Sequence, residues 1–124
     1  MDGCDTGSAK ISSGHALPAS YVIHAVGPVY ASAKRESPTL PAELLAGCYN
    51  TSLQLAAAKG GSIAFSCLST GIYGYPSAEA AEVALGVVRE WLVKEEEEQD
   101  QKLERVVFCC FEAKDERAYE KLIP

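Results

Sequence analysis

Three short apolar runs stand out along the chain, at residues 21–27, 62–67 and 106–111. Their sequences are YVIHAVG, SIAFSC and VVFCCF. All three are rich in β-branched, aromatic or cysteine side chains, and in the first run apolar residues fall on both faces of the extended chain. That pattern is typical of a strand buried in a parallel sheet, so each run predicts one strand of such a sheet.

A helical pattern fills the space between the first two runs, from about residue 39 to residue 59. Leu44, Cys48 and Leu55 recur there at near-helical intervals, with further apolar residues beside them. Glycine is favoured just past the end of a helix because it adopts backbone conformations that other residues avoid. The Gly60–Gly61 pair therefore predicts the end of this helix.

Two further helices are predicted after the second and third apolar runs. Ser77 is a plausible N-cap for the first of them, which runs into the acidic segment 95–98. The second is short and lies in DERAYEKLI, residues 115–123. One face of the longer helix carries apolar side chains at helical spacing: Ala80, Ala84, Val87 and Trp91.

The order strand, helix, strand, helix, strand, helix predicts an α/β fold. Its 124 residues, 48% of them hydrophobic, suffice for one core, so we expect a single domain over residues 1–124. The expected architecture is a three-layer α/β/α sandwich with a mostly parallel central sheet covered by helices on both faces. Ligands of such sheets bind beyond the carboxyl ends of the strands.

Charge and cysteine content narrow the functional classes. Seventeen acidic and eleven scattered basic side chains give a net charge of −6, which disfavours nucleic acid as a partner. Five cysteines without a CxxC pair indicate reduced core thiols rather than disulfides or a zinc site, so we expect no bound metal.

The chain has neither an 18-residue apolar run nor a hydrophobic N-terminus. We therefore expect a soluble cytoplasmic protein, with the nucleus as a second location, and no membrane partner.

The segment CLSTGIYGYP, residues 67–76, joins the second predicted strand to the helix that follows. At that position backbone N–H groups and the positive end of a helix dipole converge, which favours an anion. Its glycines let the backbone approach a ligand closely, and its hydroxyls add donors. It lacks the GK[ST] of a P-loop, so it predicts a diphosphate cradle made of amides. The alternative is a glycine-containing turn that binds nothing.

The chain resembles the MacroD-type branch of the macrodomains, the ADP-ribose-binding fold. Four segments carry the resemblance in the same order: CDTGSAK (4–10), SGHALPASYVIHAVGPVY (13–30), CLSTGIYGYPSAEAAEVALGVVREWL (67–92) and FCCFEAKDERAY (108–119). The resemblance implies ADP-ribose as the ligand and no separate cofactor. It also implies that Phe111 packs on the adenine and that six loop residues wrap the diphosphate and distal ribose: Ser69, Thr70, Gly71, Ile72, Tyr73 and Gly74.

The family places a longer region before the segment that resembles CDTGSAK. That region holds a strand ending in an Asn-Ala-Ala-Asn motif, a Gly-rich loop with an Asp, and a helix, none of which occurs in this sequence. In the family the strand lies between those corresponding to residues 21–27 and 62–67. We expect a sheet reduced in strand number in which these two strands close up against each other. The alternatives are a strand donated by a second chain or partner, and a truncated gene model.

Without the family's catalytic segment, the catalytic residues are unknown. The remaining candidates are Asp2, Asp5, His15 and a substrate phosphate acting on its own water. Asp5 is the first to test, against the alternative of an exposed turn carboxylate. His24 is expected to be a hydrogen-bonded core histidine, and a nucleophile pair of Cys67 with His24 is disfavoured.

Two main functions follow from the resemblance and the residues present. One is a hydrolase that removes ADP-ribose from acidic protein side chains or deacetylates O-acetyl-ADP-ribose, with weak activity. The other is a catalytically silent reader of ADP-ribose or ADP-ribosylated proteins. A third is an interaction module that forms a homo-oligomer through an opened sheet edge. We favour ADP-ribose recognition and leave enzymatic activity open.

Overall fold

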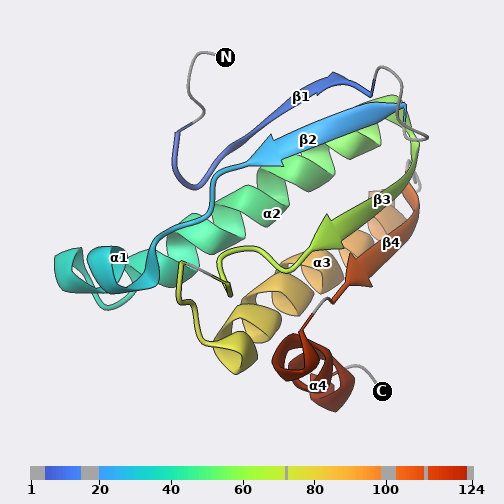
Figure 1. Cartoon of the computed structure of the whole chain (residues 1–124). Coiled ribbons are helices and arrows are strands. Elements are labelled where there is room, and N and C mark those ends of the chain that lie inside the picture. Colours follow the sequence, from blue (N-terminus) through green and yellow to red (C-terminus); the bar gives the residue numbers. More distant parts are fainter. Residues whose placement is uncertain (1–4, 15–19, 72, 99–102, 111, 123–124) are drawn as a thin grey trace.

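The computed structural model describes residues 5–14, 20–71, 73–98, 103–110 and 112–122. Four strands and four helices occur in these residues (Figure 1). In chain order they are β1 (Ala9–Ser13), β2 (Tyr21–Ala25), α1 (Tyr30–Glu36), α2 (Leu40–Lys59), β3 (Gly61–Ser66), α3 (Ser77–Glu98), β4 (Leu103–Cys109) and α4 (Ala113–Leu122). The three predicted strands and three predicted helices are confirmed within a few residues; β1 and α1 were not predicted.

The described strands form two separate two-stranded sheets. β1 pairs with β2 in antiparallel orientation, with Ile11 opposite Ile23, whereas β3 pairs with β4 in parallel, with Phe65 opposite Phe108. The prediction that β2 and β3 close up against each other is therefore wrong. The expectation of a buried parallel strand for residues 21–27 is also wrong, because every residue of β2 is exposed or half-buried and its neighbour is antiparallel.

Helix α2 has the boundaries that its sequence predicts. Pro41 lies in its first turn, where the missing N–H of proline leaves no intrahelical hydrogen bond unmade. At the other end Gly60 has φ +76°, and its N–H donates to the carbonyls of Ala56 and Ala57 at 3.0 and 3.2 Å. The N–H of Gly60 thus provides a donor for carbonyls in the last turn of α2. Its positive φ disfavours a residue with a side chain, so glycine at this position ends the helix.

An aromatic cluster joins α2 to β3, β4 and α4. Tyr49 of α2 packs edge-on against Phe65 with ring centroids 4.8 Å apart, and Phe65 stacks on Phe108 at 5.8 Å. Phe108 in turn contacts Tyr119 of α4 at 4.9 Å. Because these rings are contributed by four elements, the burial of their surfaces holds the β3–β4 pair against α2 and α4.

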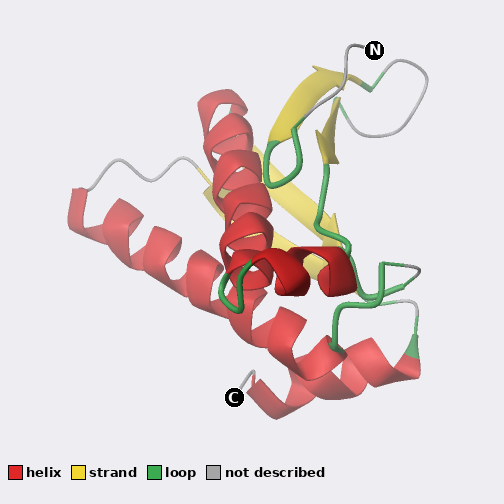
Figure 2. Cartoon of the chain, turned by 90° about the vertical axis from the view of Figure 1, so that its left-hand side faces the viewer, coloured by secondary structure: helices red, strands yellow, loops and turns green. Residues whose placement is uncertain are grey.

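Helices α2 and α3 lie on one side of the strands (Figures 1 and 2). The alternation of β3 agrees, because Ile63 and Phe65 are buried while Ser62, Ala64 and Ser66 are exposed. The expected helix layer on the second face is not formed by the described residues. No helix in the described part of the chain is long and apolar enough to cross a membrane.

Candidate functional site

The segment 67–76 forms an irregular loop from the end of β3 to the start of α3 (Figure 1). Two internal hydrogen bonds shape it: the N–H of Gly74 donates to the carbonyl of Gly71 at 3.0 Å, and that of Tyr75 to the carbonyl of Ser69 at 2.8 Å. A third bond, from the N–H of Tyr30 to the carbonyl of Tyr73 at 3.0 Å, ties the loop to α1. The loop is thus a folded turn held by its neighbours.

A buried hydrogen-bond pair anchors the loop to α4. Thr70 Oγ1 donates to Asp115 Oδ2 at 3.0 Å, and both side chains are almost completely buried. Lys114 Nζ donates to the carbonyl of Thr70 at 2.7 Å. A hydrogen bond to a charged group is stronger than one between neutral groups. These contacts therefore fix the loop to α4 at Thr70.

Ser69 adopts a left-handed backbone conformation with φ +65°, which is uncommon for a residue with a side chain. Its Oγ is buried and has no hydrogen-bond partner among the described residues. A Cβ added at Gly27 would collide with this Oγ, so glycine just past β2 is what lets Ser69 pack there. Such strain persists only where surrounding structure enforces it, and it often marks a ligand site.

The outward side of the loop is open. A Cβ added at Gly71 or Gly74 would meet no atom within 4 Å, and Gly74 has φ +73°. No acceptor for the N–H groups of Thr70 and Gly71 is found among the described residues. Unpaired amides beside open space are the arrangement that binds an anion.

The two tyrosines of the loop play different roles. Tyr75 is 3% exposed and packs edge-on against Tyr30 with centroids 4.9 Å apart; its burial raises the pKa of the phenol to about 12. Tyr73 is 42% exposed. Only Tyr73 is therefore free to cover a ligand as an apolar lid.

The start of the following helix differs from its prediction. Ser77 is the first residue of α3, and its buried Oγ has no hydrogen-bond partner in the described residues. The N–H of Ala80 donates instead to the carbonyl of Pro76 at 2.9 Å. The predicted N-cap bond from Ser77 is therefore not formed.

Five of the seven predicted ligand residues are placed by the structure, and these five lie together in the loop. Two others, Ile72 and Phe111, lie outside the described residues. Sequence reasoning missed Lys114 and Asp115, which hold the loop from α4. Their spacing from the loop, more than forty positions along the chain, left no local signal.

Cys67, at the entrance of the loop, is not poised as a nucleophile. Its Sγ lies 3.5 Å from Sγ of Cys110, and burial together with this thiol neighbour raises the pKa of Cys67 to about 12. A reactive cysteine requires the opposite shift, because the thiolate is the nucleophile. The described cysteines are free thiols, but only Cys48 is buried, so the expectation of core thiols holds for one of them.

We expect Cys67 to react with iodoacetamide more slowly than Cys109 at pH 8. Cys109 is exposed, whereas the raised pKa of Cys67 leaves little thiolate at that pH. Peptide mapping by mass spectrometry after timed quenching compares both thiols in one sample. Equal labelling rates of Cys67 and Cys109 would contradict the raised pKa of Cys67.

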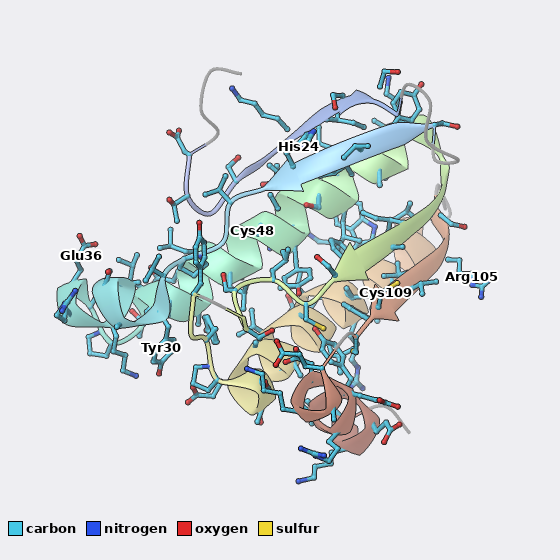
Figure 3. The ribbon with its side chains drawn as sticks, in the orientation of Figure 1. His24, Tyr30, Glu36, Cys48, Arg105 and Cys109 are labelled. Atoms are coloured by element: carbon cyan, nitrogen blue, oxygen red, sulfur yellow. The ribbon has the colours of Figure 1, made fainter. Side chains whose placement is uncertain are left out.

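The catalytic candidates are dispersed or undescribed. His24 is exposed on β2, with its Nε2 3.1 Å from Ser12 Oγ (Figure 3), so it is hydrogen-bonded as predicted but is not a core residue. Asp5 is exposed, and its carbonyl accepts the N–H of Ser8 at 3.0 Å in a turn before β1. Asp2 and His15 lie outside the described residues. In the described part of the chain, no cluster of three or more His, Cys, Asp or Glu could hold a metal ion.

Comparison with known proteins identifies the fold. A family model described as the macro domain matches residues 1–84. The chain belongs to the macrodomain family. It is 46% identical over 122 residues to human ADP-ribose glycohydrolase MACROD2, covering 98% of this chain and 27% of that protein. It is also 46% identical to a macro domain-containing protein of Chlorobaculum tepidum, covering 99% of this chain and 67% of the relative.

Solved macrodomains share the fold at similar identity. The Trypanosoma brucei macrodomain in complex with ADP-ribose has a TM-score of 0.82 and 40% identity, covering 99% of this chain and 48% of that one. The macro domain of ganglioside induced differentiation associated protein 2 has a TM-score of 0.84 and 37% identity, covering 98% and 57%. The chain thus spans about half the length of these solved macrodomains, and its resemblance to the family is confirmed.

Proposed function

We propose that this macrodomain binds ADP-ribose and recognises or processes mono-ADP-ribosylated proteins. The observation that carries the proposal is the loop at residues 69–74, where the N–H groups of Thr70 and Gly71 have no acceptor among the described residues and Gly71 and Gly74 border open space. A relative of 40% identity is solved in complex with ADP-ribose, which supports the same ligand class.

In this proposal, two kinds of protein group contact different parts of the ligand. Backbone amides and hydroxyls of Ser69–Gly74 take the diphosphate and the distal ribose, and exposed Tyr73 covers them. Phe111 takes the adenine by ring packing, as the family resemblance implies. Amides are suited to the charged centre and an aromatic ring to the base.

Recognition is favoured over rapid hydrolysis by the chemistry of the loop region. Hydrolysis of an ADP-ribosyl ester requires a positioned water and a group that activates it. Two acids lie near the loop: Asp115 is almost completely buried and accepts from Thr70 through Oδ2, and Glu79 accepts from the hydroxyl of Tyr30 at 3.4 Å. The names of the curated relatives, ADP-ribose glycohydrolases, support hydrolysis as the second half of the proposal.

Calorimetric titration with ADP-ribose, beside a turnover assay on a mono-ADP-ribosylated protein, tests the proposal. Binding with release of ADP-ribose identifies a hydrolase, and binding without release identifies a reader. No heat of binding at millimolar ADP-ribose would reject both the hydrolase and the reader.

We also propose a cytoplasmic or nuclear location, which imaging of a tagged chain tests. A homo-oligomer formed through an opened sheet edge is a further proposal, which light scattering tests.

A further inference from the structure

Two thiols meet where the parallel strands β3 and β4 end. Ser66 and Cys109 are opposite each other in the register and are the last residues of the two strands. The residues that follow them, Cys67 and Cys110, are therefore the next pair, and their Sγ atoms lie 3.5 Å apart. The label of Cys109 marks this end of β4 in Figure 3. Both cysteines of the pair are free thiols, so two reduced sulfur atoms are in contact beside the loop.

This pair has the geometry that a disulfide requires. Neighbouring strands lie about 4.8 Å apart, within the range of about 4.4–6.8 Å between the Cα atoms of disulfide-bonded cysteines. An S–S bond is about 2.05 Å long, so the two sulfur atoms need to approach each other by about 1.5 Å. Bond formation therefore requires a small displacement of the two segments and no change in the register of β3 and β4.

Cys109 is less well placed to bond with Cys67. Successive side chains along a strand point to opposite faces of the sheet, so Cys109 points away from the face that Cys110 shares with Cys67. The exposures agree, because Cys109 is exposed whereas Cys67 and Cys110 are both half-buried. The geometry therefore selects Cys110 as the partner of Cys67, although Cys109 is easier to reach from solvent.

We propose that Cys67 and Cys110 form a reversible disulfide in the presence of hydrogen peroxide, which makes this strand end a thiol modification site. The bond joins the two segments that shape the loop. Cys67 is three residues before Thr70. Cys110 is five residues before Asp115, the acceptor of the Thr70 hydroxyl. Drawing the sulfur atoms together moves the start of the loop relative to its anchor. Oxidation therefore weakens the binding of ADP-ribose, a consequence that rests on the proposed function, whereas the disulfide itself does not.

The two thiols have different roles in the reaction. Burial of Cys67, together with its contact to Cys110, raises the pKa of Cys67 to about 12, so Cys67 keeps its proton while Cys110 reacts first. The thiolate of Cys110 attacks the peroxide and takes one oxygen as a sulfenic acid, and the other oxygen leaves as hydroxide, which is protonated to water.

The second step closes the bond. The sulfur of Cys67 attacks that of Cys110, the S–S bond forms, the S–O bond breaks, and the hydroxyl leaves with the Cys67 proton as water. The existing contact of the two sulfur atoms favours this step over attack by a thiol from solution. In total the two thiols lose two electrons and two protons, and the peroxide is reduced to two water molecules.

Peptide mapping of the peroxide-treated wild-type chain tests the disulfide. Trypsin cleaves after lysine and arginine, so Cys67 lies in the peptide 60–89 and Cys110 in the peptide 106–114. In the monomer band of a non-reducing gel we expect these two peptides joined by a crosslink that dithiothreitol separates. The crosslink persists in Cys109→Ser and is lost in Cys110→Ser, which distinguishes the two cysteines of one peptide. Absence of the crosslink in the wild type, or its persistence in Cys110→Ser, would overturn the proposal.

Calorimetric titration with ADP-ribose before oxidation, after oxidation and after reduction measures the effect on the loop. We expect at least about fivefold weaker binding by the oxidised wild type, recovery with dithiothreitol, and no effect of peroxide on Cys110→Ser. Equal affinity of the crosslinked and reduced chains would overturn control of the loop by the disulfide. Absence of binding by the reduced chain would reject the proposed function and this consequence with it, whereas the peptide map still decides the disulfide.

Discussion

The Gly71→Glu variant is expected to lose ADP-ribose binding by at least about 100-fold, a change of about 2.7 kcal/mol. A side chain at this position meets no atom of the chain within 4 Å, so it extends into the open space beside the amides. Glutamate there fills the proposed diphosphate site and places a negative charge against the phosphates. Isothermal titration of both proteins with ADP-ribose measures the loss.

Gly71→Ala is the matched control for this loss. The φ of Gly71 is outside the left-handed range, and the new methyl group has no close neighbour, so alanine leaves the backbone unstrained. We expect affinity within a few-fold of the wild type and the same circular dichroism in both variants. Wild-type affinity in Gly71→Glu would show that the loop is not the phosphate site.

Local patterns predicted the elements but not their pairing. Helical spacing and the Gly60–Gly61 stop were enough for α2, since they depend on residues near each other in the chain. Pairing depends on contacts distant in sequence. The apolar faces of residues 21–27 indicated a buried parallel strand, but the structure gives β2 an antiparallel neighbour, β1, whose polar sequence AKISS carries no strong strand signal.

The local features of the candidate site were predicted as well, whereas its contacts between distant residues were not. The loop was predicted from its glycines and its position after β3, because both are local features. Its anchors were not, because Asp115 reaches Thr70 only after α4 has packed beside α3. In sequence, Asp115 is one acid among several in a polar helix, and its burial follows from tertiary packing alone.

Loss of this anchor is the second large effect we expect. In Asp115→Ala, Thr70 Oγ1 loses its acceptor on α4 and the loop is held by fewer contacts. A hydrogen bond to a charged group contributes about 1.5–3 kcal/mol, which corresponds to a loss of ADP-ribose affinity of about 10- to 150-fold if the loop must be preordered to bind. Titration calorimetry measures it, and Glu116→Ala, the exposed neighbour on α4, is the control.

A double-mutant cycle distinguishes positioning of the loop from general destabilisation. If Asp115 acts through Thr70, then Thr70→Val alone weakens ADP-ribose binding to a similar degree, and the double variant is no weaker than either single one. Asp115→Asn retains an acceptor for the Thr70 hydroxyl and should recover part of the affinity. Additive losses of affinity would show that Asp115 does not act through Thr70. A lowered melting temperature with unchanged affinity would assign Asp115 to fold stability alone.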